Sequence, residues 1–307
     1  MKKKILSGII ALAVAIPCAF GLVACDKKTD DETPAPAPAM VFDEWDGTLA
    51  DVSEAVSGVI TIDSAKEFAG LADSVNEGTD YDGVTIKLTC NIDLKNIEWT
   101  PIGFGSSTGA GTLDDEEHKW FKGDFDGQNH TIKNLKVTEF TGGELGDTEA
   151  ASGVALFGHV HNGSVKNLII DTARVDGNHF VAAVVGFSLG TTIENVSVKN
   201  ADINCTFAND DESGDKAAAV VAFAADNNES NSLVKNCSAT NCTVEADRDA
   251  GQIVGCAQEY TYETTSVVED NTASNVVVSY NGDVDNKHSS KSNTNINNEI
   301  IGRDILG

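Results

Sequence analysis

Histidines are the residues of this 307-residue chain whose spacing first suggests chemistry. His159 and His161 flank Val160, so on a strand both rings would face the same side, and His179 follows about one repeat later. Such a group could bind a metal ion or supply a general base. The chain has no Ser/His/Asp arrangement, no HExxH sequence and no Cys/His spacing typical of zinc. We therefore interpret these histidines as exposed turn residues, and we predict neither a metal site nor a cofactor.

Carboxylates are the second candidate, because a suitable pair would allow glycoside hydrolysis and a basic residue beside Ca²⁺ would allow elimination. The outward positions of the repeated strand described below are mixed in character: Lys133, Lys136, Lys166, Ile169, Glu194, Ser197, Lys235 and Ser238. Asp124 and Asp126 resemble the start of a calcium loop, but the later acidic positions are missing. The sequence therefore predicts a protein that is not an enzyme.

A short strand pattern, with apolar residues at its first, fourth and sixth positions, recurs through the chain and would position these side chains. Its copies are Ile132–Val137, Val165–Ile170, Ile193–Val198, Val234–Ala239 and Val268–Ala273. From the second copy onward an apolar run precedes each one: Val154–Gly158, Ala182–Gly186, Ala218–Ala222 and Gly251–Gly255. One repeat cannot bury its own apolar face, so successive repeats must stack. We predict an all-β fold, a parallel β-helix, over residues 84–280.

The third position of the pattern is Asn134, Asn167, Asn195 and Asn236, with Asp270 in the last copy. This column could form a ladder of stacked side-chain amides at the bend of each coil, or the bend could simply tolerate Asn. We favour the ladder because Asn adopts left-handed backbone geometry and bonds to neighbouring backbone. Either way the role is structural.

The segment before the repeats is typical of a cap. Ser64–Glu67 is a capping box, and the apolar residues that follow at helical spacing predict a short amphipathic helix within an N-terminal cap of residues 41–83. Residues 84–94 alternate as a first strand pair would. Residues 281–307 are predicted to be irregular, with a last strand and cap near Ile300.

A basic and then apolar leader opens the chain, and Leu22–Cys25 resembles the lipobox of bacterial lipoproteins. The resemblance implies a signal peptide over residues 1–24 and lipid attachment at Cys25. Residues 25–40 are an acidic, Pro-Ala-rich tether. We predict an exported protein of the cell envelope, held on the outer face of a membrane through lipid. An uncleaved transmembrane anchor is the alternative.

The chain carries 21 Lys and Arg residues against 48 Asp and Glu residues, a formal net charge of −27. Nucleic acids and anionic membrane surfaces attract clustered positive charge, so this balance argues against both as electrostatic partners. Beyond the signal and lipid cysteines, an odd number remains, and we predict that they are buried packing residues: Cys90, Cys205, Cys237, Cys242 and Cys256.

Three segments, Trp99–Gly103, Phe121–Ile132 and Val154–Gly158, together with the strand copies, resemble the GLUG-type repeat β-helix domains of bacterial surface lipoproteins. The resemblance extends from about Ile60 to Val278. It implies a right-handed solenoid with pectate-lyase-like topology, and a displayed or adhesive role.

The leading functional hypothesis is a non-enzymatic, lipid-anchored surface protein whose scaffold serves adhesion or binds an extracellular glycan or host protein. Tyr260 and Tyr262, which alternate in an insertion between repeats, are the candidate ligand contacts. A carbohydrate-active enzyme with a dispersed site, either a polysaccharide lyase or a glycoside hydrolase, is one alternative. A purely structural envelope component is the other.

Overall fold

The computed structural model describes residues 39–106, 118–139, 151–206, 216–226, 231–247, 249–258, 266–280 and 301–304. Almost all of these belong to one compact unit, Met40–Gly307. The expected signal peptide, Cys25, most of the tether, Tyr260 and Tyr262 lie outside the described residues. No helix among the described residues is long and apolar enough to cross a membrane.

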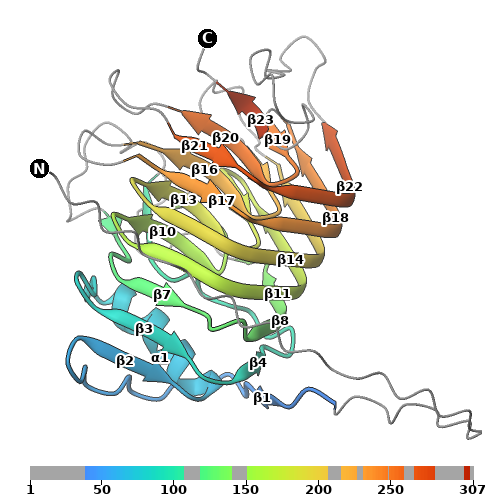
Figure 1. The fold of residues 1–307 in the computed structure, drawn as a ribbon. Helices are drawn as coiled ribbons and strands as arrows, with labels where there is room; N and C mark the ends of the chain where they lie inside the picture. Colours follow the sequence, from blue (N-terminus) through green and yellow to red (C-terminus); the bar gives the residue numbers. More distant parts are fainter. Residues whose placement is uncertain are drawn as a thin grey trace, which may run out of the picture. The chain divides into compact units, whose positions relative to one another are not determined.

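Parallel strands from successive coils stack on one another, so the fold is an all-β solenoid (Figure 1). The longest sheet contains β1 (Phe42–Glu44), β2 (Val59–Ile62), β3 (Thr85–Leu88), β4 (Asn91–Asp93), β7 (Asp124–Asp126), β8 (Thr131–Val137), β11 (Ser164–Gly177), β14 (Thr192–Cys205), β17 (Leu233–Lys235), β18 (Ser238–Ala246), β21 (Val267–Glu269) and β22 (Thr272–Tyr280). A second parallel sheet contains β10 (Phe157–His161), β13 (Val185–Leu189), β16 (Val221–Ala225), β20 (Val254–Gln258) and β23 (Ile301–Asp304). A third contains β12 (Phe180–Ala182), β15 (Lys216–Ala218) and β19 (Asp249–Gly251). The short strands β5 (Phe104–Ser106), β6 (His118–Lys119) and β9 (Ala151–Ser152) form an antiparallel sheet.

Four of the five expected strand copies stack in register, since Val165 pairs with Ile193, Ile193 with Val234, and Val234 with Val268. The first copy does not follow this register. Ile132 pairs with Ile170 of the next coil, and Phe125 occupies the position below Val165. The prediction that Ile132 begins an equivalent copy is therefore wrong, because the equivalent of Val165 is Phe125, seven residues before Ile132.

Two left-handed bends divide the long strands of each coil. The first bend contains Asn167, Asn195, Asn236 and Asp270, whose φ angles lie between 52° and 57°. The second contains Asn134, Thr172, Asn200, Asn241 and Asn275, whose φ angles lie between 54° and 63°. Asn134 belongs to this second column, because the residues on either side of it pair with those around Thr172. The prediction of one column with Asn134 at its start is therefore wrong.

The apolar runs predicted as strands turn corners instead. Ala182 ends β12 and Val185 begins β13, while Ala183 and Val184 occupy the corner between the two sheets. All four side chains are fully buried. Because residues on both sides of the corner face the interior, hydrophobicity alone could not distinguish this corner from a buried strand.

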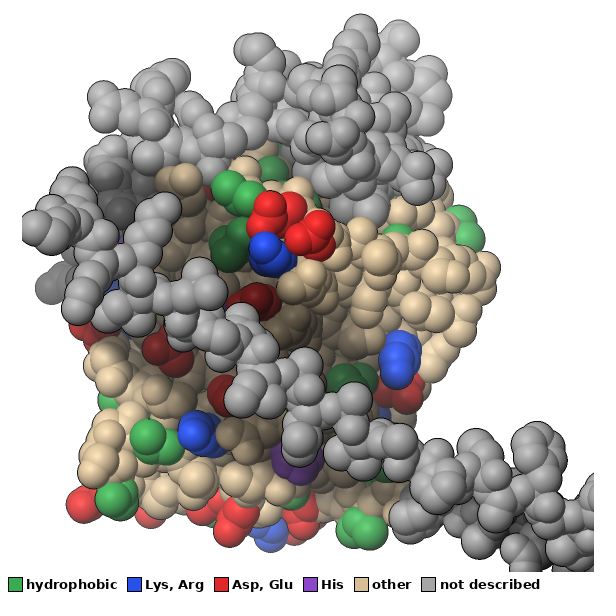
Figure 2. Space-filling view, in the orientation of Figure 1, with side chains coloured by type: hydrophobic (Ala, Val, Ile, Leu, Met, Phe, Trp, Pro, Cys, Tyr) green, Lys and Arg blue, Asp and Glu red, His purple; other side chains and the backbone are tan. Residues whose placement is uncertain are grey.

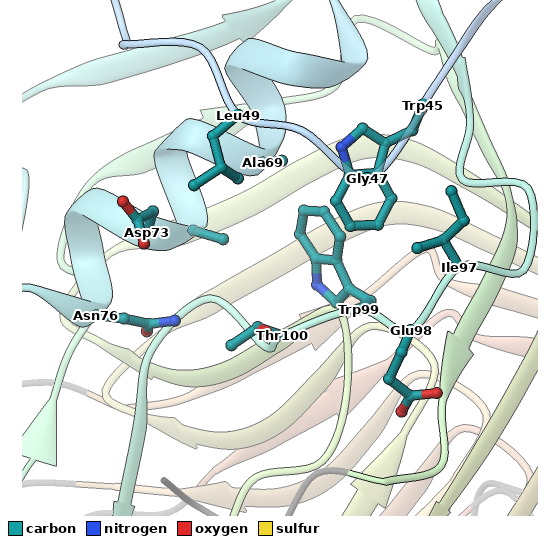
Figure 3. Close-up of a pocket in the computed structure, with 11 residues that line it drawn as sticks. Trp45, Gly47, Leu49, Ala69, Asp73, Asn76, Ile97, Glu98, Trp99 and Thr100 are labelled. Atoms are coloured by element: carbon teal, nitrogen blue, oxygen red, sulfur yellow. The ribbon is translucent and has the colours of Figure 1, made fainter. Parts of the chain in front are cut away.

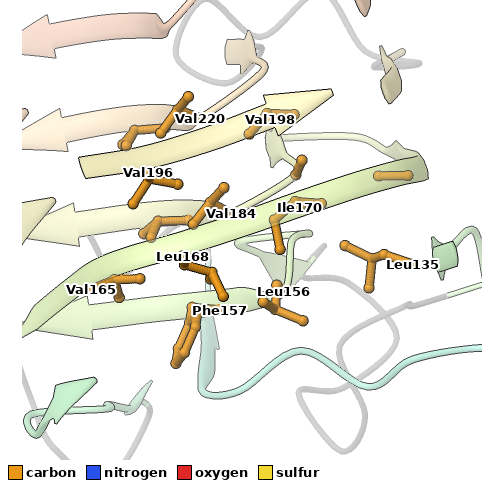
Figure 4. Close-up of a cluster of buried hydrophobic side chains, with 14 of the residues drawn as sticks. Leu135, Leu156, Phe157, Val165, Leu168, Ile170, Val184, Val196, Val198 and Val220 are labelled. Carbon is orange, nitrogen blue, oxygen red and sulfur yellow. The ribbon is translucent and has the colours of Figure 1, made fainter. Parts of the chain in front are cut away.

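The interior is built mainly from aliphatic side chains that repeat from coil to coil. Figure 4 shows Leu135, Leu168, Val196, Phe157 and Val184 converging between the sheets, and each is 1% exposed or less. Burying one such side chain contributes about 1.5–3 kcal/mol relative to leaving it exposed. Stacked layers of this kind form one core that runs through successive coils.

The helix α1 (Ala65–Asn76) packs against the first coils. The Ser64 hydroxyl accepts a hydrogen bond from the Glu67 backbone N–H at 3.3 Å, and the Asp63 N–H donates to the Glu67 carboxylate at 2.9 Å. The capping box therefore begins the helix where the sequence indicates. Phe68 stacks on Trp99 with ring centroids 5.1 Å apart and lies 5.9 Å from Phe125, which joins the helix to the core.

Candidate functional site: a pocket beside the N-terminal helix

A cavity of about 310 Å³ lies between α1 and two segments that flank it in space, residues 45–49 and 97–100 (Figure 3). We call it the cap pocket. Its lining residues are Trp45, Gly47, Leu49, Ala69, Ala72, Asp73, Asn76, Ile97, Glu98, Trp99 and Thr100. This volume falls at the lower end of the range typical of small-molecule sites.

Two largely buried indole rings lie at the back of the pocket. Trp45 and Trp99 meet edge to face, with ring centroids 5.5 Å apart. The Trp45 N–H donates to the Thr48 carbonyl at 2.8 Å, and the Trp99 N–H donates to the Leu156 carbonyl at 3.1 Å. Both N–H groups are therefore used within the chain, and the rings offer the pocket only their carbon surfaces.

The Glu98 carboxylate also lines the pocket, but its acceptor positions are occupied. One oxygen accepts from the backbone N–H groups of Thr138 and Glu139. The other accepts from the Thr138 hydroxyl at 3.2 Å and lies 3.1 Å from the Lys136 ammonium. A carboxylate offers about four lone-pair positions, so Glu98 is saturated by its own chain. Burial alone would raise the pKa of Glu98, but these hydrogen bonds together outweigh it and lower that pKa.

Asn76 is held in place by two hydrogen bonds to the chain. Its amide donates to the Pro101 carbonyl at 3.0 Å, and its oxygen accepts from the Gly103 N–H at 2.9 Å. For the Asp73 carboxylate and the Thr100 hydroxyl, both on exposed residues, the structure records no hydrogen bond or ion pair to another described residue. The cap pocket therefore presents one available carboxylate beside aromatic and aliphatic walls.

This arrangement suits binding better than hydrolysis. Glycoside hydrolysis needs two carboxyl groups that can exchange protons or attack the substrate. Glu98 is held as an ion and has no position left for a substrate or a water, so Asp73 has no catalytic partner among the lining residues.

Of the histidines that the sequence makes candidates, His159 and His161 lie on the outer face of β10, and His179 lies in the bend before β12. His159 and His161 do face the same side, since both lie about 5 Å from the Trp120 ring. They are not exposed turn residues, however: His159 is fully buried on β10, and His179 is 6% exposed. Because side chains alternate between the two faces of β10, Val160 packs into the main core. The histidines on the other face pack against a second apolar cluster that contains Phe187. No group of three potential metal ligands occurs among the described residues.

The outward strand positions form the mixed face that the sequence predicts. Ion pairs join neighbouring coils there, as between Lys133 and Asp93 at 3.3 Å and between Lys235 and Glu269 at 2.6 Å. Of the cysteines predicted to be buried, Cys205, Cys237, Cys242 and Cys256 are buried and Cys90 is only partly buried. None of these five forms a disulfide within the described residues. Figure 2 shows acidic side chains gathered along the lower edge, where the cap elements lie in Figure 1.

The capping box and the strand repeats do not predict the cap pocket. Trp45 precedes the capping box by almost twenty residues, and Trp99 was noted only as part of a family-like segment. One signal was available: two of the three tryptophans flank the single predicted helix. A tryptophan on each side of an amphipathic helix marks large rings that must pack against it.

No family model matches the chain. The chain is 31% identical over 159 residues to halomucin of Haloquadratum walsbyi, an alignment that covers 51% of this chain and 2% of halomucin. Its structure is similar, with a TM-score of 0.44 and 19% identity, to a crystal structure from Bacteroides ovatus whose protein is provisionally named an immunoglobulin A1 protease. That similarity covers 72% of this chain and 57% of the other. The chain thus spans only part of either protein, and neither similarity assigns it a family or an activity.

Proposed function

We propose that this protein is a non-enzymatic, lipid-anchored component of the cell envelope that binds an extracellular ligand through the cap pocket. The lipobox-like Leu22–Cys25 supports the anchor at the outer face of a membrane. The resemblance to GLUG-type repeats supports a right-handed, pectate-lyase-like solenoid that displays its binding surfaces away from the membrane. An extracellular glycan or a host protein is the proposed class of ligand.

The observation that carries this proposal is the saturation of Glu98. A pocket with indole walls and two carboxylates has the composition of a sugar-processing site. Because Glu98 bonds to Thr138, Glu139 and Lys136, only Asp73 can engage a ligand with its charge. We therefore propose that the pocket binds its ligand without converting it chemically.

The test is a glycan and extracellular-matrix array probed with the full chain, scored for both retention and release of products. Leu49 is 51% exposed at the pocket, and Val56, outside the lining, is 76% exposed. We expect Leu49→Lys to abolish retention, while the matched Val56→Lys retains it. Released oligosaccharides would favour the enzyme alternative, and a blank array would favour a purely structural component.

A further inference from the structure

We infer that the cap pocket recognises a primary ammonium group carried on an aliphatic or sugar stem. This inference rests on the proposed binding function and specifies its ligand chemistry. Three observations carry it: the hydrogen-bonding capacity that the lining side chains have left, the charge of the pocket, and the nature of its walls.

The remaining hydrogen-bonding capacity consists mainly of acceptors. The indole N–H groups and the Asn76 amide all donate within the chain. Among the lining side chains, the Thr100 hydroxyl and the second N–H of the Asn76 amide could still donate to a ligand, whereas the Asp73 carboxylate alone offers several lone pairs. A ligand that bonds well here must therefore supply the donors. A primary ammonium has three N–H donors and no acceptor, which matches this requirement.

The charge of the pocket favours the same group. The Lys136 ammonium offsets the Glu98 carboxylate at 3.1 Å, while no ion pair of the Asp73 carboxylate to a described residue is recorded. No lysine or arginine lines the cavity. The pocket therefore carries an uncompensated negative charge within a chain of net charge −27, which repels anionic ligands.

The walls suit a cation on an apolar stem. Trp45 is 7% exposed and Trp99 is 1% exposed, so their rings lie behind the pocket and offer a ligand almost no surface of their own. Leu49, Ile97 and Ala69 add aliphatic surface along which methylene groups could pack. A quaternary ammonium would carry the same charge but could not donate to Asp73.

The amine could come from a lysine side chain or from an amino sugar, and matched probes separate the two. We would titrate the full chain with Nα-acetyl-lysine amide and its Nε-acetylated form, and with glucosamine and N-acetylglucosamine, following tryptophan fluorescence and calorimetry. Acetylation removes the charge while keeping the stem. We expect each bound amine to lose at least about tenfold in affinity on acetylation, and binding to weaken as salt is raised.

Two variants test whether amines bind in the cap pocket. We expect Asp73→Asn to weaken amine binding about tenfold, because one charge-assisted hydrogen bond is lost. Asp82→Asn removes the same charge from an exposed residue outside the lining, and it should bind as the wild type does.

Equal affinity for amine and acetylated probes, or an Asp73→Asn variant that binds like the wild type, would overturn the inference. If array ligands are retained through the pocket and none depends on an amine, the inference falls and the proposed function stands. If neither amines nor array ligands bind, both fall.

Discussion

At the scale of the residue, the asparagines at the two bends determine where each coil turns. A left-handed backbone is unfavourable for most residues, but Asn adopts it at little cost and its amide can bond to the coil beneath. Asn195 donates to Asn167 at 3.1 Å at the first bend, and Asn275 donates to Asn241 at 2.8 Å at the second. The amide ladder thus exists in part at both bends.

The sequence pattern could reveal an asparagine bend but could not separate the two bends. Both require an inward apolar residue two positions before the asparagine and another directly after it. Ile132 to Leu135 fits this description as well as Val165 to Leu168 does. Only the hydrogen-bonded register assigns Asn134 to the second bend.

We expect Asn200→Ala to destabilise the protein by about 1–2 kcal/mol, and Asn200→Gly by clearly less. Asn200 has a φ of 55° and donates to the Asp171 carboxylate at 2.8 Å. Alanine removes the hydrogen bond and also disfavours the left-handed backbone conformation, whereas glycine removes only the hydrogen bond. Urea denaturation of the three proteins measures the difference, and equal losses would mean that the backbone conformation contributes little.

Glu98 should make stability depend on pH. Its pKa in the folded protein lies below the ordinary 4.5, so the carboxylate contributes its full stabilisation above that value. The contribution is lost as the pH falls through the lowered pKa. We expect Glu98→Gln to cost about 1–3 kcal/mol at neutral pH, and the gap to wild type to shrink in acid. Chemical denaturation at neutral and acidic pH measures the difference in unfolding free energy between Glu98→Gln and the wild type. Glu54→Gln, at an exposed residue, is the control. A difference that does not change with pH would contradict a stabilising, ionised Glu98.

At the scale of the element, α1 both covers the first coils and forms one side of the cap pocket. Its start was predictable, because the capping box is a local signal that depends on a few adjacent residues. Its contact with residues 45–50 was not, because that contact depends on a close approach between distant segments. Gly70 permits this close approach because it has no side chain: a Cβ at this position would lie 1.9 Å from the Ala50 carbonyl oxygen.

We therefore expect Gly70→Ala to lower stability by about 1–3 kcal/mol, even though alanine is the better helix former by about 1 kcal/mol. The added methyl must displace Ala50, whose N–H donates to the Lys66 carbonyl at 3.0 Å, and with it the pocket wall. Gly78→Ala is the control, since no atom lies within 4 Å of its Cβ although its φ is +112°. Both variants should melt earlier, but only Gly70→Ala should change ligand binding and Trp45 fluorescence.

At the scale of the whole molecule, each coil depends mainly on its neighbours. In a stacked architecture, stability is close to a sum of coil and interface terms, so terminal coils open more readily than central ones. β22 is the last long strand that the structure describes, and Val276 and Val278 on it are only half-buried. Their partners on β18, Cys242 and Val244, are 1% exposed or less, so among the described residues β22 is packed less tightly than the strand beneath it.

The buried cysteines can report this order of opening. Cys242 on β18 pairs with Val276 of β22, while Cys205 on β14 lies one coil deeper, beneath Ala246. Burial raises the pKa of Cys242, and it raises that of Cys237 to about 11, so neither thiol reacts readily in the folded protein. We expect alkylation by iodoacetamide at rising urea to reach Cys237 and Cys242 before Cys205. Because displacing the coil of β22 uncovers the first two and leaves Cys205 beneath β18, separated midpoints would establish unzipping from this end. A single shared midpoint would show instead that the solenoid unfolds as one cooperative unit.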